Sequence, residues 1–198
     1  MIPGRQLRQT FADGWEEPGV GSAPKGEGMD PRPTPASEVS AQTVNGSDLR
    51  RALQAHGAGV VIVTTAGPEG PAGLTVTSFT SLSLNPPLIS FSIGRKSSTL
   101  AAFRMSSCFA VHVLGSKQHE LAQRFAAKGA DRFAPPTEWT EGPLGVPILN
   151  GALAHMICTR HAVLGFGDHS LFVGCVIVAS KGQDGPALVH HQGVLRAL

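Results

Sequence analysis

A run of hydroxyl side chains is the feature of this sequence best suited to bind a small molecule. Between positions 75 and 83, six of the nine residues are serine or threonine: Thr75, Thr77, Ser78, Thr80, Ser81 and Ser83. Hydroxyl groups both donate and accept hydrogen bonds, so a strand lined with them suits a planar heterocycle with mixed N–H and C=O edges, such as a flavin. A solvent-facing strand has the same composition, and spacing alone leaves that alternative open.

Two cations and three hydroxyls follow in the segment Gly94-Arg-Lys-Ser-Ser-Thr99. This segment lies between a predicted strand and a predicted short helix. Cationic and hydroxyl side chains beside a helix N-terminus are typical of a phosphate site. The spacing is not that of a P-loop, which excludes that class of nucleotide site. A capped loop in solvent is the alternative explanation.

A carboxylate and an imidazole are neighbours in the segment Gly165-Phe-Gly-Asp-His169. We expect a turn between two strands here. Asp168 beside His169 is a pair that can exchange protons with a ligand. Turns of this composition also form for purely local reasons, so a plain hairpin is the alternative.

The other reactive residue types favour no further site. His190 and His191 are adjacent on a predicted strand and therefore point to opposite faces, so they do not chelate a metal together. His155 and His161 lack metal-binding spacing, and no metal site is predicted. Cys158 has no general base nearby in the sequence, and no GxSxG motif marks a hydrolase.

Composition narrows the class of protein. Of the 198 residues, 15% are charged, and the net charge of +2 comes without a run of lysine or arginine. A nucleic-acid binder driven by phosphate contacts is therefore not expected. No stretch has 18 uninterrupted apolar residues and no apolar signal segment begins the chain, so neither membrane insertion nor secretion is predicted. Three cysteines without a CxxC pair indicate reduced thiols and a cytoplasmic location.

Residues 1–46 differ from the rest of the chain. They contain six prolines and seven glycines, and their charges sum to −2, against +4 for residues 47–198. Such a segment buries too little apolar area to offset the entropy cost of ordering it. We therefore predict a disordered Pro/Gly-rich tail at 1–46 and one domain at 47–198.

Apolar periodicity in the second segment predicts mostly strands. A helix is expected at 47–57, with Ser47 as its N-cap and Gly57 at its end, and two more at 97–104 and 117–127. Strands are expected at 60–65, 74–84, 88–93, 108–114, 153–164, 170–179 and 187–190, and residues 131–150 are expected to be irregular. This order favours an antiparallel β-barrel with small helices. The βαβ alternation and GxGxxG motif of a Rossmann domain are both missing.

Taken in order, these segments resemble the flavin reductase-like, FMN-binding split-barrel family. The matching segments are 61–65, 75–88, 109–114, 118–125, 131–133, 151–154 with Cys158, and 167–169. The resemblance covers about residues 47–198 and is greatest to the short-chain reductase components of two-component flavin monooxygenases.

The resemblance implies a homodimeric, Greek-key-like split barrel that transfers hydride from NADH or NADPH to FMN or FAD and supplies reduced flavin to a separate monooxygenase. Its implied flavin-binding residues are Thr75, Val76, Thr77 and Ser78 along the isoalloxazine, Ser81 and Leu82 toward the ribityl and phosphate, and Lys96, Ser97, Ser98, Arg95 and Arg132 at the phosphate. The nicotinamide nucleotide is assigned to Gly167, Asp168 and His169. Hydride transfer between cofactors requires no catalytic side chain.

Two departures and two alternatives accompany this resemblance. The family usually ends with an aromatic-rich strand that contains tyrosine, whereas this chain has no tyrosine and carries His190 and His191 at the matching end. The tail at 1–46 is not needed for the chemistry.

Two alternative functions remain open. One is a flavin-binding or flavin-sensing module without turnover, and the other is a split-barrel oxidase with its own organic substrate. The sequence does not distinguish NADH from NADPH, or FMN from FAD.

Overall fold

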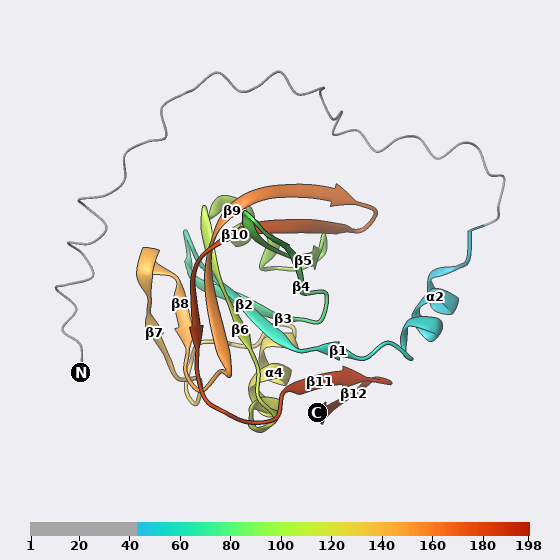
Figure 1. The fold of residues 1–198 in the computed structure, drawn as a ribbon. Coiled ribbons are helices and arrows are strands. Elements are labelled where there is room, and N and C mark those ends of the chain that lie inside the picture. The colour runs from blue at the N-terminus through green and yellow to red at the C-terminus, as the bar shows by residue number, and fades with distance from the viewer. Residues whose placement is uncertain (1–42) are drawn as a thin grey trace, which may run out of the picture. The chain divides into compact units, whose positions relative to one another are not determined.

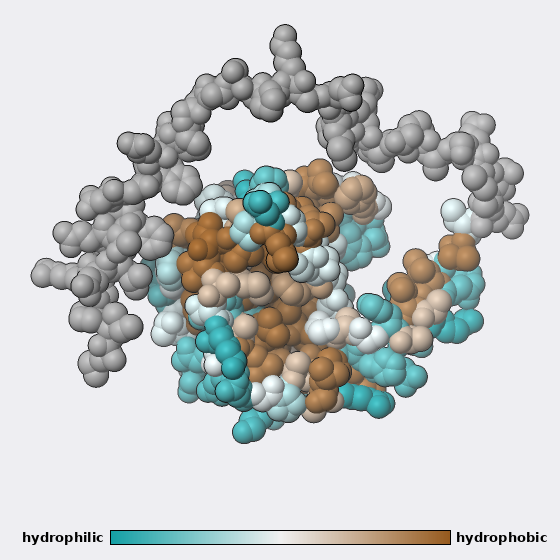
Figure 2. All heavy atoms as spheres, viewed as in Figure 1, coloured by the Kyte–Doolittle hydropathy of each residue, from teal (hydrophilic) through white to brown (hydrophobic). Residues whose placement is uncertain are grey.

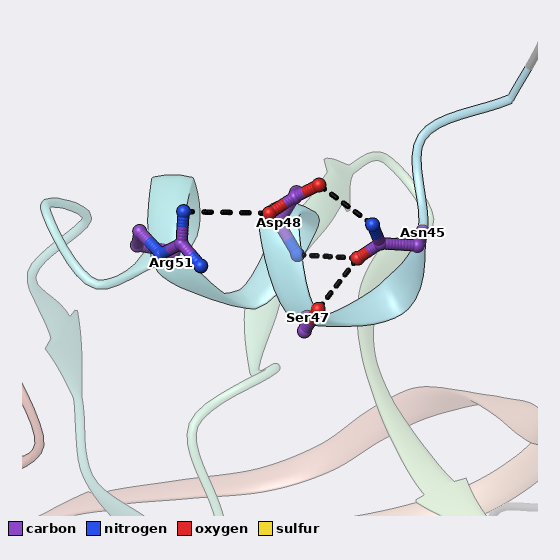
Figure 3. Close-up of polar contacts among 4 residues, drawn as sticks. All are labelled: Asn45, Ser47, Asp48 and Arg51. Carbon is purple, nitrogen blue, oxygen red and sulfur yellow. Dashed lines mark hydrogen bonds and ion pairs between the residues drawn. The ribbon is translucent and has the colours of Figure 1, made fainter.

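The computed structural model describes residues 43–198 (Figure 1). Residues 1–42 of the predicted disordered tail therefore lie outside the described residues, and the structure does not test that part of the prediction. The first described element is helix α2, Gly46–Leu53, which begins inside the segment assigned to the tail. Its N-cap is Asn45, whose Oδ1 accepts a hydrogen bond from the Asp48 backbone N–H at 2.9 Å (Figure 3). Ser47 as N-cap was thus wrong, because Ser47 Oγ donates to that same oxygen at 2.6 Å.

Most of the described chain is β-strand, as expected from the sequence. The strands are β1 (Ala58–Gly59), β2 (Val61–Gly67), β3 (Gly70–Val76), β4 (Thr80–Leu84), β5 (Pro87–Gly94), β6 (Cys108–Val113), β7 (Trp139–Glu141), β8 (Pro147–Leu149), β9 (Ala154–Phe166), β10 (His169–Lys181), β11 (Leu188–His191) and β12 (Val194–Ala197). The helices after α2 are α3 (Leu100–Met105) and α4 (His119–Ala126), with short 3-10 turns η1 (Ser116–Gln118) and η2 (Pro143–Gly145). No helix of residues 43–198 is both long and apolar enough to cross a membrane.

One sheet of seven strands forms the body of the fold, in the order β3-β2-β6-β9-β10-β5-β4. Every pairing in it is antiparallel. Strands β3 and β4 are the two edges, so strand pairing does not close the sheet into the expected barrel. The smaller sheets are β1-β11-β12 and β7-β8.

The single strand predicted at 74–84 is two strands. Strand β3 pairs with β2 and ends at Val76, whereas β4 begins at Thr80 and pairs with β5. The chain must therefore pass from one edge of the sheet to the other between these two residues. Strands β7 and β8 occupy the segment 131–150 that was expected to be irregular, and β12 was not predicted.

Both faces of β2 are buried, each against a different part of the core. Val61 and Val63 pack into a cluster built on phenylalanines, whereas Ile62 packs on the opposite side with α4 and with Val60, which precedes the strand. In the first cluster, Phe91 stacks on Phe172 with ring centroids 5.5 Å apart. Burying each such side chain contributes roughly 1.5–3 kcal/mol, so this cluster anchors the strands β5 and β10 that carry the predicted site.

Candidate functional site

The ladder between β5 and β10 brings the three predicted motifs together. Its register places His169 opposite Gly94, and the two strands lie side by side in Figure 1. The backbone N–H of Arg95 donates to the Asp168 carbonyl at 2.8 Å. On the other side of β5, Ser78 Oγ accepts the Ser92 N–H at 2.9 Å. Segments separated by about 90 residues in the sequence therefore form one continuous surface.

The hydroxyl residues do not all face this surface. Thr75 Oγ1 donates to the Ala122 carbonyl of α4 at 2.6 Å, and the side chain of Val76 is buried in the phenylalanine cluster. Thr77 and Ser78 are exposed in the break between β3 and β4. Ser81 and Leu82 are exposed on the edge strand β4. Of the predicted isoalloxazine residues, Thr77 and Ser78 thus present their side chains outward.

The segment after β5 forms a tight turn into α3. The Ser97 N–H donates to the Gly94 carbonyl at 2.9 Å, and Ser97 Oγ lies 2.8 Å from Thr99 Oγ1. Lys96 and Ser98 are exposed beside it. The Thr99 side chain lies at the N-cap position of α3 without capping it, and the helix begins at Leu100 rather than at 97 as predicted.

A cavity of about 530 Å³ lies beside this turn, a size usual for small-molecule sites. Its walls are the β2–β3 hairpin, α3 and residues 130–133, and they include Ser98 and Arg132. The sequence analysis assigned no function to residues 67–71 of this hairpin. Their sequence, Gly-Pro-Glu-Gly-Pro, has few large side chains that could fill the space beside α3.

Arg132 has a structural role as well as a place in the cavity wall. Its guanidinium donates to the carbonyls of Phe125 at 3.1 Å and Ala127 at 2.8 Å, at the C-terminal end of α4. A cation there satisfies carbonyls that have no partner within the helix. The loop that carries Arg132 is further held by Asp131 Oδ1, which accepts the Ala134 N–H at 3.1 Å.

Asp168 and His169 form the polar tip of the β9–β10 hairpin. The turn is made by Gly167 and Asp168, and Gly167 has φ +51, a left-handed conformation that favours glycine. His169 Nδ1 lies 2.6 Å from Asp168 Oδ1. The hydrogen bond from His169, with the charges of His169 and Arg95, holds the pKa of Asp168 below its usual range. This bond orients the imidazole and leaves Nε2 available on the side of Gly94.

Two buried titratable groups lie away from this surface. His112 Nδ1 donates to the Ile62 carbonyl at 3.1 Å, and Nε2 accepts the Leu149 N–H at 3.1 Å. Burial lowers the pKa of His112 to about 4, so the imidazole is a neutral bridge between β2 and β8. Burial raises the pKa of the Cys158 thiol to about 12. Within residues 43–198, no three His, Cys, Asp or Glu side chains are grouped as metal ligands.

The sequence profile of the flavin reductase like domain matches residues 53–198 of this chain. The chain belongs to this family. An NADH:FMN oxidoreductase of Rhodococcus qingshengii is 39% identical over 150 residues, which are 74% of this chain and 78% of that protein. The reductase subunit HsaB of a flavin-dependent monooxygenase from Rhodococcus jostii is 37% identical over 155 residues, or 78% of this chain and 79% of the subunit.

Solved structures of flavin reductases have the same fold. The NADH:FAD oxidoreductase SgcE6 of Streptomyces globisporus, solved with NAD and FAD fragments, superposes with a TM-score of 0.73 at 34% identity. The alignment covers 80% of this chain and 97% of that one. The family resemblance stated from the motifs is thereby confirmed.

The C-terminal departure from the family lies apart from the three motifs in this chain. His190 and His191 are on β11, which pairs with β1 and β12 in the three-stranded sheet. His169 lies in the seven-stranded sheet. In this flavin reductase-like chain, no strand pairing among the described residues therefore joins His190 or His191 to His169.

Proposed function

We propose that this protein is an NAD(P)H:flavin oxidoreductase that transfers hydride from NADH or NADPH to FMN or FAD and supplies reduced flavin to a separate monooxygenase. The observation that carries the proposal is the β5–β10 ladder, which joins the exposed hydroxyls, the cationic turn and the Asp168–His169 pair. A relative named NADH:FMN oxidoreductase supports the hydride transfer to flavin, and a relative named reductase subunit of a flavin-dependent monooxygenase supports the supply of reduced flavin to a partner.

The residues present fit a phosphorylated heterocycle. Thr77 and Ser78 offer hydroxyls to its ring edges, and Ser81 and Leu82 border its side chain. We assign its phosphate to Lys96, Ser97 and Ser98 together with Arg95 and Arg132, because cations and hydroxyls bind phosphate. Of these five residues, Ser98 and Arg132 line the cavity. For Thr75 and Val76 we propose contact with the ring through the backbone alone, since the Val76 side chain is buried and the Thr75 hydroxyl donates to a carbonyl of α4.

Bound flavin supplies the hydride-accepting ring, and the chain's own groups orient the reactants. Asp168 fixes the His169 imidazole, whose Nε2 is then presented to the nicotinamide nucleotide together with the Gly167 turn. Holding two rings at about 3–3.5 Å supplies much of the acceleration of such a transfer. This role requires no nucleophile and no general base among the residues of the site.

We further propose a homodimeric, Greek-key-like split barrel. Apolar side chains exposed on the edge strand β4 and on the β9–β10 hairpin support a second copy there: Leu84 is 89% exposed and Phe166 is 54% exposed. Soluble monomers seldom leave apolar surface and a free strand edge together. Light scattering during gel filtration tests this, and a monomer mass would refute it. The cytoplasmic location stays a prediction.

The activity is tested by following NADH and NADPH at 340 nm with FMN, FAD or no flavin. We expect oxidation that depends on added flavin and on no organic substrate. The variant His169→Ala should raise the KM for the nucleotide and leave flavin binding unchanged. Flavin binding without turnover would replace the proposal by a binding or sensing module, and oxygen use that requires an organic substrate would indicate an oxidase.

A further inference from the structure

Helix α2 has no buried residue, although its apolar side chains lie on one face. Every residue from 43 to 57 is exposed, and the exposed fractions of Leu49 and Leu53 are 50% and 56%. Leu49, Ala52 and Leu53 share a face, because residues three and four positions apart are neighbours on a helix. Figure 1 shows the helix apart from the seven-stranded sheet, and Figure 2 shows apolar atoms uncovered on it.

Local contacts set where α2 begins but do not stabilise it alone. Asn45 caps the helix by accepting the Asp48 N–H (Figure 3). Helices shorter than about 12–15 residues are marginal in water by themselves, and α2 has eight residues. Within residues 43–198, one hydrogen bond joins α2 and the four residues after it to later elements, from the Gln192 N–H to the Gln54 carbonyl at 3.1 Å. The apolar face therefore needs a surface that this part of the same copy does not supply.

The β9–β10 hairpin carries a second uncovered apolar surface, on the face of His169. Ser170 is fully buried, so its neighbours His169 and Leu171 lie on the opposite face of β10. In the ladder between the two strands, Phe166 pairs with His169. Leu164 pairs with Leu171 in the same ladder. Leu164 and Phe166 therefore share the face of His169, and about half of each is exposed.

The uncovered apolar surfaces are together large enough for a dimer. Seven apolar residues with exposed fractions of 47–89% lie on α2 and the residue before its N-cap, on the edge strand β4 and on the hairpin: Val44, Leu49, Leu53, Leu82, Leu84, Leu164 and Phe166. They correspond to about four fully exposed side chains, or roughly 600–1,000 Å² at about 150–250 Å² for a large side chain. A stable dimer buries about 800 Å² on each partner.

A second copy of the chain supplies the partner of both surfaces at once. Helix α2 and the hairpin belong to the same chain, and neither covers the other, since the apolar side chains of both are exposed. In a two-fold pair, the helix of each copy lies on the hairpin of the other, so two equal contacts form and neither surface stays open. Residues 54–57 belong to no helix or strand and link α2 to β1. Exchange of a terminal element over such a link is a low-cost route to a dimer.

We propose that α2 is an arm exchanged between two copies of this chain, with its Leu49–Leu53 face packed on the β9–β10 hairpin of the other copy. The inference rests on the proposed homodimer and not on the proposed reaction. Because Leu164 and Phe166 share the face of His169, the arm of one copy borders the proposed nucleotide site of the other. Each site is then completed by the second copy.

The test compares Leu49→Glu with Leu144→Glu, the same change at a 58% exposed leucine of η2 that lies on neither surface. Glutamate is a good helix former and suits the N-terminal half of a helix, so Leu49→Glu does not by itself unfold α2. We expect Leu49→Glu to raise the dimer dissociation constant, from analytical ultracentrifugation, on the order of a hundredfold, because each dimer contains the change twice. Leu144→Glu should stay within twofold of wild type.

Hydrogen exchange separates a second copy from a cover within one chain. The amides of residues 49–53 should be protected in the wild-type dimer and unprotected in the monomer, reached by dilution or by Leu49→Glu. Protection that persists in the monomer would mean that the same chain covers α2, residues 1–42 included, and would overturn the inference.

A disulfide test locates the contact. Leu53→Cys combined with Phe166→Cys should give a covalent dimer on a non-reducing gel after mild oxidation, and neither single variant should. A link within one chain would overturn the exchange, as would equal dissociation constants for Leu49→Glu and Leu144→Glu. A wild-type monomer would refute the homodimer and the arm together. Absence of NADH oxidation would refute the reductase activity alone, since none of these measurements uses turnover.

Discussion

His112 makes the stability of this fold depend on pH between about 6.5 and 4, most of which lies above the ordinary pKa values of carboxylates. The imidazole is buried between the Ile62 carbonyl and the Leu149 N–H, and it stays neutral in the fold because its pKa is lowered to about 4. In the unfolded chain its pKa returns to about 6.5. Above pH 6.5 the imidazole is neutral in both the folded and the unfolded state, so its titration does not change the free energy of unfolding. Below pH 6.5 the unfolded state binds a proton that the folded state does not.

The free energy of unfolding must therefore fall as pH drops from about 6.5 to about 4. Each pH unit in this range costs about 1.4 kcal/mol, so the fold loses about 3 kcal/mol in all from this one group. That is a large share of the 5–15 kcal/mol typical of a domain. Protonation would also break the hydrogen bond from Leu149, since Nε2 would no longer accept it.

Urea unfolding at pH 7.5 and pH 4.5, at one protein concentration, measures the effect. We expect wild type to lose about 2.5 kcal/mol more between the two conditions than the variant His112→Gln, which has no titrating ring. His155→Gln is the matched control, because it removes the stacked imidazole 6.4 Å away and keeps His112. It should keep the pH dependence of wild type. Equal losses in wild type and His112→Gln would refute the reasoning.

Three further outcomes follow from contacts in the site and core. Gly174→Ala should destabilise the fold by about 1–3 kcal/mol in urea melts, because its Cβ would lie 2.3 Å from Phe109 Cζ; an unchanged midpoint would contradict this. Thr75→Val should lower the free energy of unfolding by about 1 kcal/mol, because the hydrogen bond to the Ala122 carbonyl is lost, and should leave the Kd for FMN unchanged. Thr77→Val should weaken FMN binding and leave the stability unchanged. Arg132→Gln should lower both the melting temperature and the affinity for FMN, since the guanidinium caps α4 and lines the cavity. A loss of only one of the two would contradict this double role.

Local sequence patterns were sufficient to predict helices and strands whose residue types and spacing follow one regular period. Strand β2 and helix α4 were both predicted from the sequence, as a strand at 60–65 and a helix at 117–127. The break between β3 and β4 was not, because hydroxyl residues continue through it while the pairing partner changes from β2 to β5. The bond of Thr75 to Ala122 spans 47 positions, and no local pattern contains that information.

Some signals were present and were not used. Gln192 and Gly193 both have positive φ, +52 and +76, which makes the tight turn between β11 and β12. A glycine in a two-residue loop between apolar residues is a hairpin signal, and it would have predicted β12. At the site, the sequence grouped Arg95, Lys96 and Ser98 as one phosphate-binding segment, whereas the cavity wall contains Ser98 and neither Arg95 nor Lys96. That difference depends on how the chain turns after β5, which the sequence does not state.

The proposed reaction releases reduced flavin, and reduced flavin that meets oxygen before its partner enzyme yields hydrogen peroxide. A thiolate, not a thiol, is the form that peroxide oxidises. With its pKa raised to about 12 by burial, the Cys158 thiol is ionised in only about one molecule in 30,000 at pH 7.5. An ordinary exposed cysteine would be ionised in about one in ten. The hydrophobic core around Cys158 thus protects this thiol against the peroxide that the proposed reaction can generate.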